Sequence, residues 1–217
     1  MFCFPWQTCV KKLTVLYKMN KPQPIFTVGY GTSSIEEFID LLKHYQIKCI
    51  VDVRSSPYSK FNPDFSIGAL KRHLEANGIA YQYMGDTLGG KPSDPSCYHP
   101  NGRPDYSKIK EKDFFKKGIQ EVLSLWRSYQ PQRIALMCAC QSPERCHRSK
   151  LVGQYIYEIR DNDDISVVHI YMDKDGSYQE VDQHQVVLKI VQGQLNLFGY
   201  EYERSITLSS KKIKNNI

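Results

Sequence analysis

The sequence predicts a three-layer α/β/α fold built on a mostly parallel, Rossmann-like sheet. Short apolar runs typical of buried strands alternate along the chain with amphipathic helical stretches. Turn residues separate the two kinds of segment, and no internal repeat is apparent. The chain has 217 residues, of which 41% are hydrophobic and 24% charged, so one domain of ordinary size buries a substantial core.

The first predicted strand covers residues 25–28, where an apolar run is followed by a glycine-containing turn. The helix after it is indicated by its N-cap, either Ser33 or Ser34, and by two glutamates in its first turn. A second buried strand at residues 49–53 leads into Arg54. These segments form the first β-α-β unit.

The next predicted elements are a helix at residues 66–77, which Gly78 closes, and a strand at residues 79–84. A proline-containing loop follows at about residues 85–109. Loops of this length inside a compact domain are usually functional or mobile. An amphipathic helix at residues 111–129 comes after the loop.

The most strongly indicated strand covers residues 133–138. A helix at residues 142–159 follows, with Ser142 as its N-cap and Pro143 as its first helical residue. A fifth strand is predicted at residues 167–170. The alternation of strands and helices predicts right-handed crossovers between parallel strands.

The net charge of +6 comes from the two ends of the chain. Residues 1–18 carry three lysines and residues 204–217 carry four basic residues, with no acid in either segment, so residues 19–203 carry −1. Net charge alone therefore predicts no basic surface on the central part of the chain.

Seven cysteines form an odd number at irregular spacing, and the N-terminus lacks an export signal, so we expect free thiols and a cytoplasmic location. No apolar run approaches 18 residues, which predicts no membrane span. We expect translation to start at Met19, or the preceding residues to form a disordered tail. The predicted parts are a disordered or misassigned leader (1–22), an α/β domain (23–175) and a C-terminal extension (176–217).

Polar residues follow three of the predicted strands. Tyr30 lies in the turn after the first strand, Asp52, Arg54 and Ser55 lie at the end of the second, and Cys138 ends the fourth. Ligands collect at the carboxyl ends of parallel strands, so we expect a site at this edge of the sheet. Asp52 is interpreted either as a structural partner of Arg54 or as a base or metal ligand beside an anion-binding arginine.

A segment rich in cysteine, histidine and arginine connects the fourth strand to the last helix. Cys146, His147 and Arg148 are expected in the first or second turn of that helix, whose N-terminus favours an anion. The Cys146 thiol is a candidate nucleophile with a lowered pKa, and Cys138 is a second candidate. Packing of small buried thiols is the alternative interpretation.

A metal site is a further alternative, because Cys138 and Cys140 share a strand face and Cys146 and His147 follow closely. The spacing Cys-x-Cys-x5-Cys-His matches no common zinc pattern, so no residue is assigned as a metal ligand and the cofactor is left open. The Cys-x5-Arg spacing of cysteine phosphatases is not found in this segment either.

Four ordered motifs resemble a known family, the domain of unknown function 488, over about residues 25–172. The motifs are Thr27-Val28-Gly29-Tyr30-Gly31, Val51-Asp52-Val53-Arg54-Ser55-Ser56-Pro57, Leu88-Gly89-Gly90, and Cys138 with Pro143-x-x-Cys146-His147-Arg148. The resemblance implies an α/β domain with a pocket formed by these motifs, and it implies no particular reaction. The family pattern usually has an acidic residue where this chain has Cys140.

Ten residues of these motifs are the expected site. The catalytic candidates are Cys138, Cys146, His147 and Asp52, and the substrate-binding candidates are Tyr30, Arg54, Ser55, Gly89, Gly90 and Arg148.

A separate motif lies near the C-terminus, at residues 194–199. Through Gln194, Leu195, Leu197 and Phe198 it resembles the short peptide by which bacterial replication and repair proteins bind the DNA sliding clamp. The alternative is an amphipathic strand or helix that packs on the domain.

We interpret the chain as a cytoplasmic protein that acts as an enzyme on a phosphate-bearing or nucleic-acid substrate at the polar edge of the sheet. The first alternative is a noncatalytic accessory module of DNA metabolism that docks on a sliding clamp. The second alternative is a metal-bound structural domain.

Overall fold

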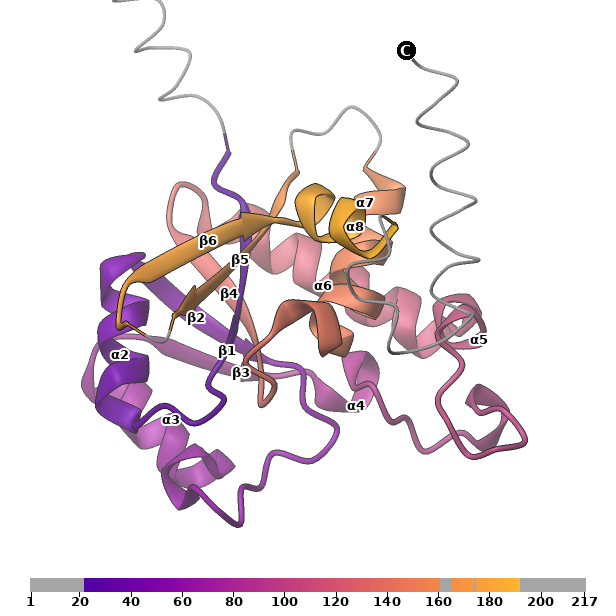
Figure 1. Ribbon diagram of the computed structural model, residues 1–217, viewed down its shortest axis with the longest axis horizontal. Coiled ribbons are helices and arrows are strands. Elements are labelled where there is room, and N and C mark those ends of the chain that lie inside the picture. The colour runs from indigo at the N-terminus through magenta and orange to yellow at the C-terminus, as the bar shows by residue number, and fades with distance from the viewer. Residues whose placement is uncertain (1–21, 161–164, 174, 192–217) are drawn as a thin grey trace, which may run out of the picture.

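The computed structural model describes residues 22–160, 165–173 and 175–191, and its centre is a six-stranded sheet (Figure 1). The strand order is β3-β2-β4-β1-β5-β6, with the first five strands parallel and β6 antiparallel to β5. The strands are β1 (Ile25–Gly29), β2 (Ile47–Asp52), β3 (Ala80–Tyr83), β4 (Arg133–Cys138), β5 (Val167–Met172) and β6 (Tyr178–Asp182). This arrangement confirms the predicted α/β fold with its mostly parallel sheet.

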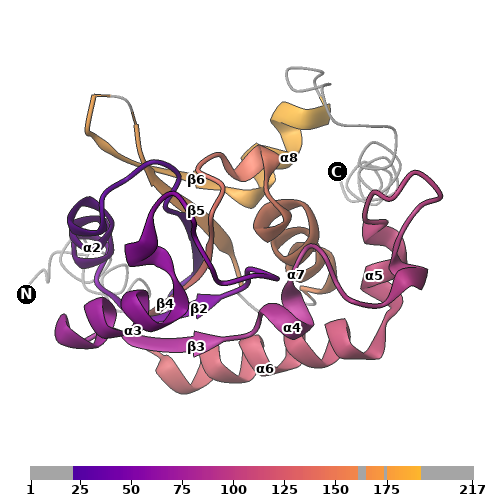
Figure 2. The ribbon, with the colours of Figure 1, turned by 90° about the horizontal axis from the view of Figure 1, so that it is seen from below.

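Helices cover both faces of the sheet and give the fold three layers (Figure 2). One face carries α2 (Ile35–His44) and α3 (Ile67–Ala76), and the other carries α6 (Asp113–Tyr129) and α7 (Gln154–Ile159). Along β4, Leu136 and Cys138 enter the core under α6 and α7, whereas Ala135 and Met137 enter the core under α2 and α3. Burial on both faces explains why this strand is an unbroken apolar run.

The start of α2 follows directly from its sequence. Ser34, rather than Ser33, is the N-cap, and its hydroxyl accepts a hydrogen bond from the Glu37 backbone N–H at 3.2 Å. The Glu37 carboxylate in turn accepts the Ser34 backbone N–H at 2.8 Å. This reciprocal pair is a capping box, and it fixes the turn between β1 and α2.

The predicted loop at residues 85–109 is more structured than its composition indicates. It contains α4 (Gly85–Leu88), a 3₁₀ turn at Pro95–Cys97 and the start of α5 (Tyr106–Glu111). Asp105 caps α5 by accepting the backbone N–H groups of the second and third helical residues. The next helix, α6, begins at Asp113, two residues later than predicted.

The predicted helix at residues 142–159 is divided into three parts. A 3₁₀ turn (Pro143–Arg145) comes first, then a π-helical turn (Arg148–Gly153), then α7. Ser142 does not cap a helix, because its hydroxyl donates to the Glu144 carboxylate instead. Cys146 has extended backbone angles, φ −111° and ψ 142°, so it precedes the helix rather than lying in its first or second turn.

The sheet extends beyond residue 175, the predicted end of the α/β domain. β6 pairs with β5, and α8 (Gln183–Val191) follows it. The predicted leader and the predicted clamp-binding peptide at 194–199 lie outside the described residues. Within the described part of the chain, no helix is long and apolar enough to span a membrane.

Candidate functional site

The polar segments predicted at the carboxyl ends of the strands meet at one edge of the sheet. Gly29 at the end of β1 pairs with Cys138 at the end of β4, and Asp52 at the end of β2 pairs with Met137. The backbone of Gly29 lies so close to the loop after β4 that an added Cβ would stand 1.8 Å from the Cys140 carbonyl oxygen. A glycine is therefore required there for β1 and the loop to approach.

Two thiols and one imidazole form a compact cluster at this edge. The Sγ atoms of Cys138 and Cys146 lie 3.7 Å and 3.9 Å from Nδ1 of His147. The three atoms all lie within 4.8 Å of one another. Cys146 is fully buried and Cys138 is 5% exposed. The strand end supplies one sulfur, and the segment before the π-helical turn supplies the other sulfur and the imidazole.

The His147 ring is held on two sides. Its Nε2 atom lies 2.8 Å from the Val53 carbonyl oxygen, so Nε2 carries the donated proton and Nδ1 faces the two sulfurs. Gly90 packs against the ring, because an added Cβ would stand 2.7 Å from the ring Cγ. Gly89 packs in the same way on Ser55, whose hydroxyl accepts the backbone N–H that follows Gly90.

The cluster favours a thiolate at Cys146. Burial raises the pKa of this thiol, but hydrogen bonds from Cys138 and Cys140, the positive charge of Arg148 and the contact with His147 together lower it well below its ordinary value. Burial lowers the pKa of His147, and the bond to Cys146 outweighs this and raises it. Thiolate and imidazolium therefore stabilise each other.

The pKa of the other buried thiol, Cys138, is shifted in the opposite direction. A hydrogen bond with Cys140 lowers its pKa, but the hydrogen bond with Cys146 and burial outweigh this effect and raise the pKa to about 11. The pKa values of the two buried thiols are thus shifted in opposite directions.

Arg148, expected to bind substrate, is fully buried and holds the loop after β4 instead. Its Nε donates to the Thr27 hydroxyl at 3.2 Å, Nη2 donates to the Gln141 carbonyl at 2.8 Å, and Nη1 donates to the Cys140 carbonyl. Every guanidinium nitrogen thus has a partner inside the protein. The arginine shapes the site and contributes charge to it rather than reaching a ligand.

Asp52 and Arg54 form a buried ion pair, which fits the structural interpretation of the two offered by the sequence. Nη2 of Arg54 lies 2.6 Å from Oδ2 of Asp52, and Nη1 donates to the Phe65 carbonyl at 2.8 Å. The Tyr81 hydroxyl donates to the same carboxylate at 2.9 Å. Tyr30 stacks on Phe65 beside the arginine, with ring centroids 4.0 Å apart. These groups brace the loop after β2.

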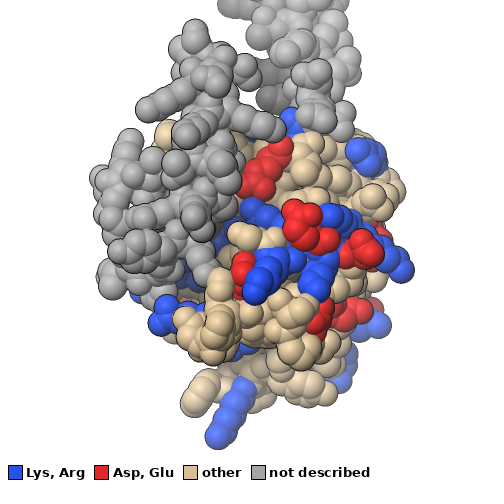
Figure 3. All heavy atoms as spheres, turned by 90° about the vertical axis from the view of Figure 1, so that its right-hand side faces the viewer, with Lys and Arg blue, Asp and Glu red and all other residues tan. Residues whose placement is uncertain are grey.

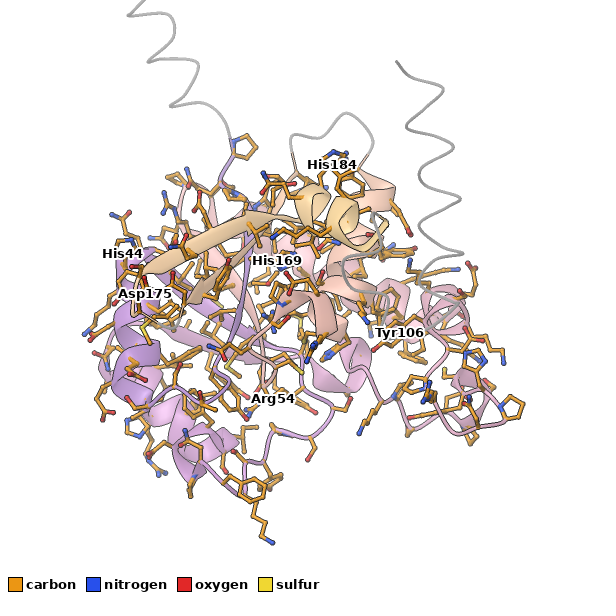
Figure 4. All side chains as sticks on the ribbon, viewed as in Figure 1. His44, Arg54, Tyr106, His169, Asp175 and His184 are labelled. Carbon is orange, nitrogen blue, oxygen red and sulfur yellow. The ribbon has the colours of Figure 1, made fainter. Side chains whose placement is uncertain are left out.

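Sequence reasoning missed a buried polar chain beneath the cluster. The Thr27 hydroxyl lies 2.6 Å from Nδ1 of His169, and Nε2 of His169 lies 2.7 Å from Oε1 of Gln183. Figure 4 labels His169 at the centre of the molecule. Gln183 then donates to Gln154, whose side chain donates to Glu158. A histidine in the apolar run of β5 was a usable signal, whereas nothing in the sequence pattern marks Gln183.

Tyr106 is a second residue that the sequence analysis did not place in the site. Its ring packs against the part of the core that contains Cys138 and Cys146, so α5 lies beside the cluster. Burial raises the pKa of its phenol, and the charges of Cys146, Cys138 and Cys140 raise it further. The residue stands in the predicted loop, where its proximity to the thiols could not be foreseen.

Charged side chains of both signs are interspersed on the face shown in Figure 3. Lys110 pairs with Glu158 at 2.9 Å, and Lys112 pairs with Asp94 at 2.8 Å. This mixed face does not resemble the single-sign surface that nucleic-acid binding favours. The nucleic-acid partner stays a prediction.

Comparison with known proteins places the chain in a family. The family model "Domain of unknown function DUF488" matches residues 34–155, a stretch that contains the whole thiol and imidazole cluster. A search of curated proteins finds no match. A solved structure from Shewanella putrefaciens CN-32, a DUF442 protein named as a candidate phosphatase, is similar at 13% identity and a TM-score of 0.40, over 88% of this chain and 89% of that one. The chain, matched over more than half its length, belongs to the DUF488 family.

Proposed function

We propose that this protein binds one thiophilic divalent metal ion, Zn²⁺, through Cys138, Cys146 and His147. The observation that carries the proposal is the spacing of the three donor atoms. A tetrahedral zinc ion with bonds of about 2.3 Å to sulfur and 2.0–2.1 Å to nitrogen separates the two donors by about 3.6 Å. The sulfur to nitrogen distances of 3.7 Å and 3.9 Å come close to this value.

The surroundings of the three donors support a metal site. A zinc-bound histidine usually donates its other ring N–H to a backbone carbonyl or a carboxylate, and His147 has the Val53 carbonyl in that position. Metal-bound cysteines are thiolates, and the lowered pKa of Cys146 favours that state. The spacing along the chain differs from a zinc finger because one ligand ends a strand and two precede a helix.

Three protein ligands leave a fourth coordination position. Zinc sites with three protein ligands and one exchangeable position are typical of catalytic centres, in which the ion polarises a substrate or lowers the pKa of a bound water. Cys138, Cys146 and His147 would hold the ion, while Gly90 and Arg148 would fix the ligands through the ring of His147 and the loop after β4.

The test is metal analysis of the purified full chain after incubation with excess Zn²⁺ and removal of free ion. We expect one zinc per chain, and a loss of binding in Cys146→Ser and His147→Ala. Cys49→Ala is the matched control, because Cys49 is a buried thiol on β2 outside the cluster. A reconstituted wild-type chain without zinc would overturn the proposal.

A second candidate function is metal-free thiol catalysis, favoured by the thiolate and imidazolium pair. Cys146 would be the nucleophile and Cys138 a neighbouring thiol. The full burial of Cys146 is the difficulty, since a substrate must displace part of the loop to reach its sulfur. Iodoacetamide labelling of the metal-free protein tests this candidate, which fails if Cys146 stays unmodified while exposed Cys140 reacts.

A further inference from the structure

Cys140 is an exposed thiol two residues after Cys138, in the loop that follows β4. Cys138 packs into the core under α6 and α7, and Ala139 packs against the opposite core, so the alternation brings Cys140 back to the side of Cys138. The trio that meets within 4.8 Å comprises Cys138, Cys146 and His147. Cys140 therefore stands next to the trio and needs a side-chain movement to join it.

The backbone of Cys140 is fixed although its side chain is exposed. Its carbonyl oxygen accepts a hydrogen bond from Arg148 and lies against the backbone of Gly29. Only side-chain torsion is left to change the position of the sulfur. Because its backbone is anchored beside two proposed metal ligands, rotation of the Cys140 side chain alone would bring the sulfur to the ion or take it away.

Charge balance favours a third thiolate. Arg148 is fully buried, and its guanidinium partners are a hydroxyl and two backbone carbonyls, all of them neutral. A buried charge without a counter-charge is costly. Zn²⁺ with two thiolates and a neutral imidazole has no net charge, whereas Zn²⁺ with three thiolates carries −1. The three-thiolate centre therefore neutralises the buried arginine.

Building on the proposed zinc site, we propose that Cys140 is its fourth ligand and that modification of this exposed thiol opens the coordination position. In the closed centre three sulfurs and one nitrogen bind the ion. When the Cys140 thiolate attacks an alkylating agent such as a haloacetamide, its electron pair forms the sulfur–carbon bond and the halide departs with the electron pair of the broken carbon–halogen bond. The resulting thioether carries no charge, binds Zn²⁺ poorly, and yields its position to water.

The test uses Co²⁺ in place of Zn²⁺, because thiolate to cobalt charge-transfer absorption reports the number of bound sulfurs. We expect Cys140→Ser to bind one Co²⁺ per chain, with this absorption reduced by about one third as three thiolates become two. Cys49→Ala should match the wild type. An unchanged spectrum in Cys140→Ser at full occupancy would refute the role of Cys140 and leave the metal site standing.

A second measurement needs no variant. Iodoacetamide should modify Cys140 more slowly in the Zn²⁺-loaded wild-type protein than in the metal-free protein, as mapped by mass spectrometry. Equal rates in the two forms contradict ligation by Cys140. If the wild-type chain binds neither Zn²⁺ nor Co²⁺, both the proposed function and this inference fail. If it binds the metal but the two modification rates are equal, only the role of Cys140 fails.

Discussion

Replacing Gly90 with alanine tests the position of His147 most directly. The added Cβ would stand 2.7 Å from Cγ, 2.8 Å from Cβ and 3.1 Å from Nδ1 of His147. Ordinary contact begins at 3.4 Å, so the ring must move by about 0.7 Å. Metal-ligand distances tolerate only about 0.2 Å, and the movement also strains the 2.8 Å contact with the Val53 carbonyl.

We therefore expect Gly90→Ala to weaken Zn²⁺ binding by about 10- to 100-fold, the usual effect of disturbing a group that orients a metal ligand. Competition with a chromogenic chelator measures the affinity, and circular dichroism checks the fold. Gly68→Ala is the matched control, because the nearest atom to its added Cβ is 3.9 Å away in α3. Wild-type affinity in Gly90→Ala would refute the assignment of His147 as a ligand.

Three further outcomes are expected. Gln183→Ala should lower the free energy of unfolding, measured in urea, by about 3 kcal/mol, because it leaves buried partner groups unpaired at about 1–3 kcal/mol each. Replacing the exposed Gln185 by alanine is the control and should change it by less than about 0.5 kcal/mol. Similar values for the two variants would contradict the buried chain. Burial, reinforced by the charge of Arg148, lowers the pKa of His169 from 6.5 to about 3. The unfolded chain therefore takes up a proton between these pH values while the folded chain does not, so stability should fall with decreasing pH by up to about 1.4 kcal/mol per unit, and His169→Gln should flatten that slope in urea titrations. A peptide of residues 194–199 should bind a purified bacterial sliding clamp in a fluorescence titration, and joint replacement of Leu197 and Phe198 by alanine should abolish binding; no binding by the unmodified peptide ends the clamp hypothesis.

The five parallel strands of the sheet and its main helices were predictable because their signals are local. The apolar run of β4 and the capping box of α2 each specify an element within a few residues. The start of the short α5 was assigned to a loop, because the composition around it is typical of loops. The helix forms there because Asp105 caps its N-terminus. The division of the predicted helix at residues 142–159 was also missed, because the Ser142 hydroxyl donates to the Glu144 carboxylate and does not cap a helix.

The site was predictable in its location and less so in the roles of its residues. Strand ends converge by topology, so the meeting of Cys138 with Cys146 and His147 could be expected. Burial depends on packing from distant elements, and this made the two arginines structural. Arg148 is enclosed by β1 and the loop after β4, and Arg54 by Asp52 and the turn around Phe65.

The buried chain from Arg148 to Glu158 has a fixed direction. A carboxylate can only accept hydrogen bonds, so the amides of Gln154 and Gln183 and Nε2 of His169 each donate toward Glu158, while the guanidinium at the other end can only donate. Burial lowers the pKa of His169 and keeps the ring neutral, so Thr27 donates to Nδ1 and Nε2 carries the ring proton. The side-chain amide of Gln183 is oriented by the same rule. Hydrogen bonds thus connect Arg148, at the edge of the thiol cluster, to Gln183 at the start of α8, so α8 is linked to the site by a directed chain of polar groups as well as by packing.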